Sequence, residues 1–447
     1  MGVGVIALCA TGLEGCSKGK NVEPDIVGPV LTGNNPTGGI SLSDSAIIDG
    51  YTDKLSYNTG ESVNIYINGE SLQDAKFGVY SPNGILKEKI ISNLTKQVPG
   101  PNPYMNGFQY NLTCSFQIPD NFPSGIYFIA KKIVFIVKNK ARNGDAVVVL
   151  ASNTDNAYNQ NGGMSSYTTP FSPVLSFQRP YSLSGWSAAF WPWVENLNYK
   201  IDYIVDQDLD EYSNFSYSKL LILPGHNEYW AKVARTNFDK FIDGGKNALI
   251  LSGNTMWWQI RYSEDKTKMI CYKDFYKDPI SDNKLKTINW YETVLRYPIE
   301  KSIGLNFDLG GYGDGGHGWS GYKIVNENSP LLSGTNLKNG DVLKCLTQEY
   351  DGTFLKYEEG NPYPVIDNKM NFHKIELIGF DKGFRLVKTV GTFIAVKKTS
   401  TSGVMVNMAS TNWCSKRGIE GEHGTEIKNI TLNAINLLLS GGNVFTG

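Results

Sequence analysis

The stretch from Lys219 to Trp258 constrains the fold most, because it reads as two buried strands joined by one helix. Residues 220–223 (Leu-Leu-Ile-Leu) form a short apolar run that ends at a Pro-Gly pair, and residues 248–252 (Ala-Leu-Ile-Leu-Ser) form a second one. Such runs are typical of strands buried on both faces of a parallel sheet. Between them, residues 231–242 carry apolar side chains at helical spacing, and a Gly-Gly pair at 244–245 supplies a helix stop.

A polar turn follows each of these two strands. Residues 225–230 read Gly-His-Asn-Glu-Tyr-Trp, and residues 253–258 read Gly-Asn-Thr-Met-Trp-Trp. Parallel strands connected by one helix end at the same edge of their sheet, which is where open α/β folds bind their ligands. We therefore expect His226, Glu228 and Asn254 to be neighbours.

The composition indicates a globular protein of more than one domain. The 447 residues are 41% hydrophobic and 12% aromatic, enough to fill two or three cores. With 42 Lys and Arg against 43 Asp and Glu, the net charge is -1, so no overall field favours nucleic acid or an anionic membrane. The six cysteines include no Cys-x-x-Cys pair, so a zinc knuckle is not expected, and we interpret those of the body as buried thiols.

The amino-terminal residues leave two interpretations open. A short apolar run covers residues 3–10 without a preceding Lys or Arg, and residues 13–16 (Leu-Glu-Gly-Cys) resemble a bacterial lipoprotein processing site. Residues 1–16 are thus a candidate signal and Cys16 a candidate lipid anchor, which would place the protein in the bacterial envelope or outside the cell. If the segment is an unrelated tail, the protein is cytoplasmic. Residues 17–45 read as a linker.

Two domains follow the linker. Residues 46–140 contain alternating apolar runs separated by Asn-Gly, Pro-Asn-Gly and Pro-Asp turns, which predict an Ig-like antiparallel β-sandwich. Residues 144–441 predict an α/β domain with a mostly parallel, flavodoxin-like sheet and a closing amphipathic helix near 426–439. Residues from about 266 to 390 form an irregular, β-rich insertion, with a glycine-rich loop at 310–319. The fold class is therefore α/β plus β.

The central stretch resembles the core of class I glutamine amidotransferases, but it cannot carry their chemistry. Those enzymes place a nucleophilic cysteine in the turn after the second strand, where this chain has Ser252, Gly253 and Asn254. No thiolate is available there, and Ser252 has no base at a fixed spacing. His226 and Glu228 could act as a base and a carboxylate or as metal ligands, or they could only cap the following helix and fill a polar pocket.

Six motifs in order point to one family. They are Pro-Ser-Gly-Ile-Tyr at 123–127 with Val-Phe-Ile-Val at 134–137, Asn-Ala-Tyr-Asn at 156–159 with Gly-Gly at 162–163, Ser-Phe-Gln-Arg-Pro-Tyr at 176–181, Tyr-Ile-Val-Asp-Gln-Asp-Leu at 203–209, the turn at 225–230, and the segment 252–261. In these motifs the chain resembles the large subunit of N,N-dimethylformamidase and the group that shares its carboxyl-terminal domain, over roughly residues 46 to 440.

The resemblance implies a mononuclear iron hydrolase that cleaves the C–N bond of a small amide. Family members hold one Fe(III) through two tyrosines and a glutamate, which correspond by motif to Tyr127, Tyr158 and Glu228. Hard anionic oxygen donors suit Fe(III), which would act as a Lewis acid and a source of hydroxide.

The resemblance also implies residues around the metal. His226 would be a proton acceptor or water positioner, Asn254 and Lys273 would surround the developing oxyanion, and Asp381 would be a further acid. We expect an amide substrate as partner, and a homo-oligomer is compatible with the sequence, which leaves open whether a small partner subunit is needed. We do not expect the protein to bind nucleic acid. We expect contact with a membrane only through a lipid anchor at Cys16.

Two other functions are compatible with the residues. The chain could be a non-catalytic surface lipoprotein that binds carbohydrate or peptide on a degenerate amidotransferase-like scaffold, with Trp186, Trp191 and Trp193 as exposed aromatic side chains. It could also be a serine or cysteine hydrolase at the turn that contains Ser252.

Overall fold

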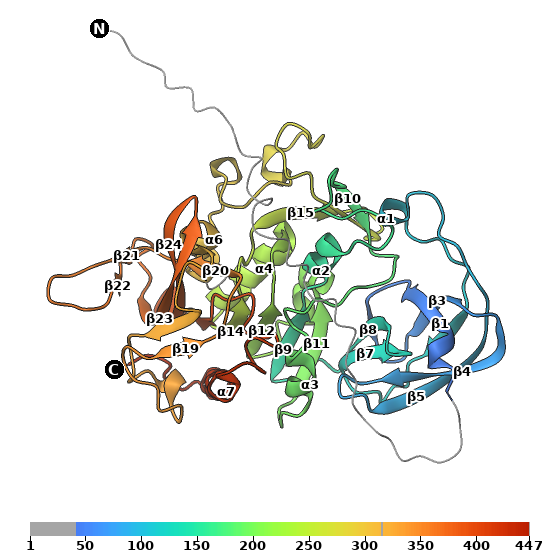
Figure 1. The fold of residues 1–447 in the computed structure, drawn as a ribbon, viewed down its shortest axis with the longest axis horizontal. Helices are drawn as coiled ribbons and strands as arrows, with labels where there is room; N and C mark the ends of the chain where they lie inside the picture. Colours follow the sequence, from blue (N-terminus) through green and yellow to red (C-terminus); the bar gives the residue numbers. More distant parts are fainter. Residues whose placement is uncertain (1–41, 314–315, 447) are drawn as a thin grey trace, which may run out of the picture.

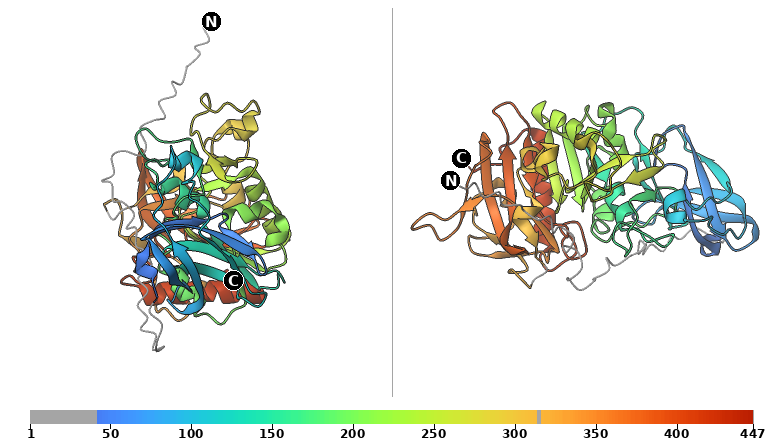
Figure 2. Two further views of the ribbon diagram at one scale, coloured as in Figure 1. Left: turned by 90° about the vertical axis from the view of Figure 1, so that its right-hand side faces the viewer. Right: turned by 90° about the horizontal axis from the view of Figure 1, so that it is seen from above.

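The computed structural model describes residues 42–313 and 316–446 of the chain, so Cys16 and almost all of the expected linker lie outside the described residues. The fold is mixed α/β, rich in sheets and with few helices. It is elongated, with the amino-terminal sheets at one end and a long carboxyl-terminal hairpin at the other (Figure 1, Figure 2). Among the described residues, no helix combines the length and the apolar character needed to cross a bilayer.

Two sheets form the amino-terminal part. The first has the order β1-β3-β6 and is antiparallel, with strands β1 (Ile47–Thr52), β3 (Ser62–Gly69) and β6 (Cys114–Gln117). The second has the order β2-β8-β7-β4-β5, with strands β2 (Ser56–Asn58), β8 (Ile133–Lys138), β7 (Gly125–Ile129), β4 (Leu72–Tyr80) and β5 (Leu86–Leu94). Side chains from both sheets share one apolar core, among them Val63, Ile65, Phe77 and Phe135. The hairpin β7–β8 is antiparallel, as the sequence predicts.

An eleven-stranded sheet forms the centre of the molecule. Its parallel part has the order β11-β9-β12-β14-β25, with strands β11 (Ile201–Val205), β9 (Ala146–Leu150), β12 (Leu220–Gly225), β14 (Asn247–Ser252) and β25 (Val404–Asn407). Its antiparallel part continues through β24 (Val387–Lys397), β23 (Lys374–Arg385), β17 (Gly311–Tyr312) and β20 (Glu349–Gly352). Strand β18 (Gly321–Ile324) also pairs with β23, and β19 (Val342–Lys344) pairs with β18. The parallel pairing of β12 with β14 is as the sequence predicts.

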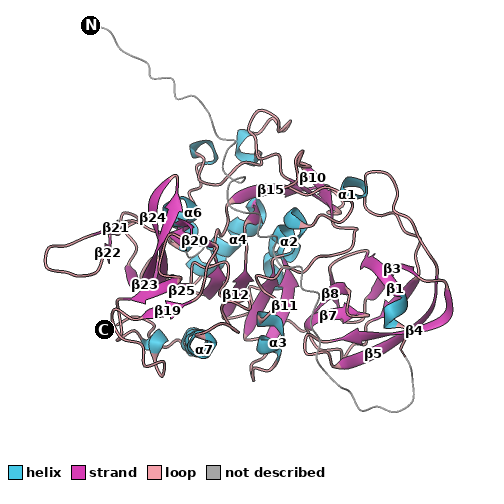
Figure 3. Cartoon of the chain, in the orientation of Figure 1, coloured by secondary structure: helices cyan, strands magenta, loops and turns pink. Residues whose placement is uncertain are grey.

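Alternate side chains of the parallel strands enter two different cores. Leu221 and Ile250 pack on one face with the helix α4 (Lys232–Asp243), whereas Ile222 and Leu249 pack on the other with α7 (Gly424–Ser440) and α3 (Phe190–Glu195). Figure 3 shows α4 and α2 (Ser152–Tyr158) on one side of these strands and α7 and α3 on the other. Burial on both faces explains why these strands read as continuous apolar runs.

The segment expected to be irregular extends the central sheet. The antiparallel strands predicted there are present, but β23 is twelve residues long and pairs with β24 along its length. Smaller elements surround this hairpin and the carboxyl edge of the parallel strands. They are α1 (Pro103–Asn106), β10 (Val174–Ser176), β13 (Tyr229–Ala231), β15 (Trp258–Tyr262), β16 (Lys268–Ile270), α5 (Glu300–Ile303), α6 (Phe307–Gly310), β21 (Leu355–Lys356) and β22 (Val365–Ile366).

One buried carboxylate organises the loops that follow β16. Asp278 accepts two hydrogen bonds from Arg261, at 2.8 and 2.9 Å, and two from the backbone and hydroxyl of Thr287, at 2.7 Å each. Burial alone would raise the pKa of Asp278, but the bonds from Arg261 and Thr287 hold it well below its usual value. The ionised carboxylate therefore ties the loop to β15.

We predict that Asp278→Asn lowers the free energy of unfolding by about 2–4 kcal/mol at pH 7, because Arg261 is left without its buried partner. The pKa of Asp278 is lower in the folded than in the unfolded chain. Its contribution is therefore fully present above about pH 4 and is lost as the pH falls further. Urea unfolding at pH 7 and at pH 3 measures both effects, and the difference between wild type and variant should shrink at pH 3.

Asp274 provides the matched control. It forms a surface pair with Lys277 at 3.4 Å, so Asp274→Asn should change stability by less than about 1 kcal/mol. Equal losses in the two variants would show that Asp278 does not hold the loop.

Candidate active site

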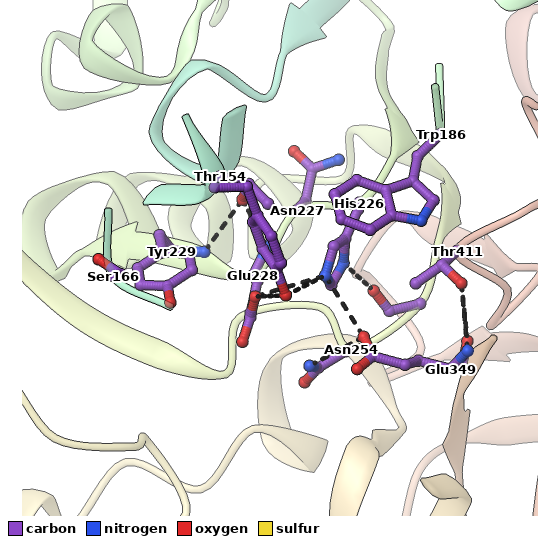
Figure 4. A network of polar contacts seen from close by, with 12 residues as sticks. Thr154, Ser166, Trp186, His226, Asn227, Glu228, Tyr229, Asn254, Glu349 and Thr411 are labelled. Carbon is purple, nitrogen blue, oxygen red and sulfur yellow. Dashed lines mark hydrogen bonds and ion pairs between the residues drawn. The ribbon is translucent and has the colours of Figure 1, made fainter. Parts of the chain in front are cut away.

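A buried histidine lies between two carboxylates at the carboxyl edge of the parallel strands (Figure 4). His226 directly follows β12, and its Nε2 atom is 3.3 Å from Glu228 Oε2 and 3.3 Å from Glu349 Oε2. The Nδ1 atom is 2.9 Å from the carbonyl oxygen of Gly253 in the neighbouring turn. Nδ1 donates this bond, since a carbonyl only accepts, and Nε2 is thus directed at the carboxylates.

The three groups perturb one another. Burial alone would lower the pKa of His226, but the hydrogen bond to Glu228 and the charges of Glu349 and Glu228 raise it to about 9. Burial alone would raise the pKa of Glu228, yet contacts with His226 and the charge of Lys273 lower it. Burial raises the pKa of Glu349, against the opposing charge of His226. The pKa values of the two carboxylates are therefore shifted in opposite directions, and Glu228 is the one held in its ionised form.

Two tyrosines complete the surroundings of Glu228. Tyr158, at the end of α2, places its hydroxyl 3.1 Å from Glu228 Oε2, and Tyr167 reaches the two carboxylate oxygens at 2.9 and 2.8 Å. The two rings stack at a centroid distance of 4.0 Å. Burial and the charge of Glu228 raise the pKa of Tyr158 well above its usual value. In the protein alone, Tyr158 is therefore a neutral donor to Glu228.

The turn after β14 is fixed against β20. Asn254 adopts a left-handed backbone conformation, φ +49°, which asparagine tolerates better than most residues, and its Nδ2 atom donates to Glu349 Oε2 at 3.2 Å. A Cβ atom at Gly253 would lie 2.4 Å from the carbonyl oxygen of Glu349, so only glycine allows this close approach. The amide of Thr255 donates to Asp351, two residues further along β20. The structure thus brings His226, Glu228 and Asn254 together, as their positions after parallel strands suggest.

Lys273 lies on the tyrosine side of the site. Its Nζ atom is 3.8 Å from the centroid of the Tyr167 ring and donates to the carbonyl oxygen of Ser166 at 3.1 Å. The charge of Lys273 also favours the ionised form of Glu228. The sequence-predicted Lys273 is therefore a neighbour of the Glu228 cluster.

The structure does not bring Tyr127 into this cluster. Its ring is buried in the core of the amino-terminal sheets against Phe122 and Phe135, and its hydroxyl donates to the carbonyl oxygen of Pro123 at 2.9 Å. The side chains of strand β7 alternate between two cores. Tyr127 faces the core between the two amino-terminal sheets. Tyr127 is thus a core aromatic residue in this structure, and Tyr167 stands beside Tyr158 instead.

Asp381 is likewise committed to the backbone. Its carboxylate accepts from the amides of Trp319, Gly321 and Lys382 at 2.8 to 3.0 Å, and from the hydroxyl of Tyr350 at 2.8 Å. These bonds join β23 to the end of the glycine-rich loop, to β18 and to β20. No contact of Asp381 with His226 or Glu228 is present among the described residues. We assign it a structural role, and Glu349 is the acid that this part of the chain contributes to the site.

The expected exposure of three tryptophans is corrected by their burial. Trp186 and Trp191 are 8% and 2% exposed, and Trp193 packs against the same core as Trp191, so these residues are not an exposed binding surface. Trp186 instead packs edge-on against His226 at a centroid distance of 4.5 Å.

Ser252 is held by structural bonds. Its hydroxyl accepts from the amide of Asn227 at 3.0 Å and from the hydroxyl of Thr255 at 3.1 Å. No histidine of the described residues contacts it, so it lacks the base that a nucleophilic serine requires.

Glu349 and Tyr167 escaped the sequence analysis. Glu349 and Asp351 are two residues apart on a strand, so their side chains share one face, and that spacing was the available signal. Tyr167 lies in an irregular segment between α2 and β10 with no regular spacing to any other site residue. Only the tertiary fold identifies it.

A metal at this site would depend on tyrosine oxygen. Among the described residues, no group of three or more His, Cys, Asp or Glu side chains is arranged to bind a metal ion. Tyr158, Tyr167 and Glu228 nevertheless converge within hydrogen-bond distance. Once deprotonated, this set presents three anionic oxygens, the donor chemistry that a trivalent iron prefers. The residues present therefore fit the implied ion by their chemistry.

We predict that the histidine with the highest pKa in the metal-free protein is His226. Removing one neighbouring charge in Glu349→Gln should lower this pKa by about 1 unit or more, since the two groups are buried and close. A chelator-treated sample followed by NMR titration resolves the four histidines of the chain. An unchanged His226 pKa in the variant would contradict the contact with Glu349.

Comparison with solved structures gives only a distant likeness. A crystal structure of a thuA-like protein from Bacteroides uniformis is 10% identical, with a TM-score of 0.32, and the match covers 67% of this chain and 93% of the other. At that level the likeness supports no argument. No curated protein gives a significant match.

Comparison with protein families is decisive. The family model described as N,N-dimethylformamidase beta subunit-like, C-terminal, matches residues 94–421, which is most of the chain and includes every residue of the site. The resemblance seen in the sequence motifs is thereby confirmed, and the chain belongs to the N,N-dimethylformamidase beta subunit-like family.

Proposed function

We propose that the protein is an iron-dependent hydrolase of the C–N bond of a small amide. Membership of the family supports a dimethylformamidase-like hydrolase, without specifying its metal or its substrate. The observation that carries the finer proposal is the convergence of two tyrosine hydroxyls and the His226 imidazole on the carboxylate of Glu228. Such a cluster combines anionic oxygen donors with a group that can exchange protons.

We propose that Tyr158, Tyr167 and Glu228 hold one Fe(III) per chain. Tyr167 takes the place expected for Tyr127, because it is the second tyrosine whose hydroxyl reaches Glu228. When bound, the iron would supply Lewis-acid chemistry, which polarises an amide carbonyl and lowers the pKa of water. The positive charge of Lys273, whose Nζ atom lies over the Tyr167 ring, favours the ionised form of Glu228.

The pair of His226 and Glu349 would move the protons. In amide hydrolysis, water attacks the carbonyl carbon and loses a proton, the C–N bond breaks, and the leaving nitrogen gains a proton. The pair can take the first proton and return the second, because Nε2 and Oε2 are 3.3 Å apart and share one buried space. Glu349, whose pKa is raised by burial, is the better proton donor of the two carboxylates.

Asn254 fixes this proton-transfer pair. Its amide nitrogen donates to the same oxygen of Glu349 that faces His226, which leaves the Oδ1 atom buried and without a hydrogen bond in the described structure. A buried acceptor in that state is expected to meet a polar partner in the working complex. We propose that Asn254 is a polar contact of the substrate.

The proposal extends to the domains and to the amino terminus. We propose that the amino-terminal sheets form an Ig-like domain within residues 46–140 and that residues 144–441 form an amidotransferase-like domain. Lipidation at Cys16, with an envelope location, is proposed from the sequence alone.

The iron site is tested by metal analysis and visible absorption of the purified full-length chain. We expect about one iron per chain and a tyrosinate-to-iron charge-transfer band. Tyr158→Phe and Tyr167→Phe should each weaken the band and lower the iron content, because each removes one anionic donor.

Tyr127→Phe is the matched control, since Tyr127 lies in the core of the amino-terminal sheets. It should keep the band and the iron. A band lost in Tyr127→Phe but kept in Tyr167→Phe would restore Tyr127 as the ligand, and a protein that takes up no iron would refute the metal proposal.

We predict that Glu349→Gln lowers kcat by about 10²- to 10⁴-fold on a simple N-alkyl amide, because the leaving amine then lacks its proton donor. On an anilide with an electron-withdrawing ring, whose leaving group needs less protonation, the loss should be much smaller. Iron content should be unchanged in this variant. Equal losses on both substrates would assign Glu349 a role other than proton donation.

A further inference from the structure

Four arginines of this chain have guanidinium groups that are largely shielded from water, and three of them donate several hydrogen bonds within the protein. Arg179 and Arg235 are 1% and 0% exposed, and both donate to several carbonyl or hydroxyl oxygens. Arg261 holds Asp278 by two bonds and the carbonyl oxygen of Leu285 by a third. In each case at least three hydrogen bonds join the guanidinium to oxygens of the protein, as is usual for an arginine with a structural role.

Arg385 differs from these three. It lies at the end of β23, its side chain is 19% exposed, and its guanidinium donates no hydrogen bond to any described residue. It forms a half-exposed ion pair with Asp308, whose Oδ1 atom is 3.6 Å from Nε, a distance too long for a hydrogen bond. The Nε atom is nevertheless buried. An arginine shielded in this way, with unused donors, is available to a planar anion.

Aromatic rings hold the guanidinium in place. Its central carbon is 5.4 Å from the centroid of the Phe307 ring and 5.8 Å from that of the Trp257 ring. These two rings contact each other edge to face at 5.3 Å. Attraction between a cation and ring faces fixes the group without using its N–H donors. The position of Arg385 is thus set before any ligand binds.

This position borders the proposed active site. Trp257 is in the same turn as Asn254, three residues further along the chain, and Phe307 begins α6, which packs against β20, the strand of Glu349. The charge of Arg385 also favours the ionised form of Glu349. Beyond Arg385, the hairpin turn exposes Leu386 and Val387. The guanidinium therefore lies against two rings, one from the turn of Asn254 and one from the helix that packs on the strand of Glu349.

We infer that Arg385 binds a carboxylate on the substrate, so that the enzyme acts on amides that carry an anionic carboxylate away from the scissile C–N bond. This inference rests on the proposed function and narrows its substrate class. An N-acylated amino acid of short chain has the required groups. Its amide would face Glu228 and Glu349 while its carboxylate pairs with Arg385, and a neutral dialkyl amide would leave the guanidinium unused. Arg385 is thus a specificity-determining residue.

The test compares N-acetylglycine, N-acetyl-β-alanine and N-acetyl-4-aminobutyrate with N-alkylacetamides of matching length on the iron-loaded full-length protein. We expect kcat/KM to favour one of the carboxylates over its neutral match by about 10-fold or more. Arg385→Gln should raise KM for that carboxylate and not for the neutral amide, and any change in kcat that comes from the lost charge near Glu349 should be the same for both substrates. Arg385→Lys should recover part of the preference. Arg417→Gln, at an exposed arginine, serves as the control.

Binding of the same compounds, measured by calorimetry, separates this inference from the proposed function. If carboxylates bind more tightly than their neutral matches and Arg385→Gln removes the difference, the inference stands even if no compound is hydrolysed, and only the proposed reaction fails. If neutral amides are bound and hydrolysed as well as the carboxylates, the inference is overturned and the hydrolase stands. Absence of any preference in binding also overturns it.

Discussion

The parallel pairing of β12 with β14 is the constraint on which the site depends. The register runs from Leu220 opposite Asn247 to Gly225 opposite Ser252, so the two strands end level with each other. The turn that carries His226 and the turn that carries Asn254 therefore begin side by side at the carboxyl edge of the sheet. A bond from the imidazole to the carbonyl of Gly253 then joins the two turns directly. Without this register, the imidazole would not be oriented towards its carboxylates.

Burying so many charged groups is unfavourable unless each is paired. Here both carboxylates of the site contact the same imidazole, and each accepts at least one further hydrogen bond. Glu228 accepts from Tyr158 and Tyr167 and faces His226, while Glu349 faces the same imidazole from the other side and accepts from Asn254. Removing any one member would leave a buried neighbour unsatisfied. In a family of hydrolases, a network of this kind concentrates perturbed pKa values at the place where proton transfer is needed. The same groups thus serve stability and chemistry.

The parts of the fold that repeat along the sequence could be predicted, and the parts that depend on single tertiary contacts could not. The buried strands, the helix between them and the meeting of Asn254 with the turn of His226 and Glu228 follow from apolar periodicity and from the geometry of parallel strands. The position of Tyr127 was misjudged because a motif gives the residue type but not the face of the strand, and β7 turns that side chain into a core. Tyr167 and Glu349 carry no periodic signal, since a loop and an antiparallel strand deliver them from distant parts of the chain.

The position of strand β20 in the sheet determines when the site can form during folding. It belongs to the antiparallel half of the central sheet, yet its Glu349 side chain reaches Asn254 in the parallel half, 95 residues earlier in the chain. Contacts over such sequence distances are formed late, because the loop between them must first be ordered. Strands β9, β11, β12 and β14 all precede β20 in the chain, whereas β25 follows it, so these four strands can assemble before the site exists. Competence for chemistry is then a property of the completed sheet, and a nascent chain that has exposed only these four strands is still inactive.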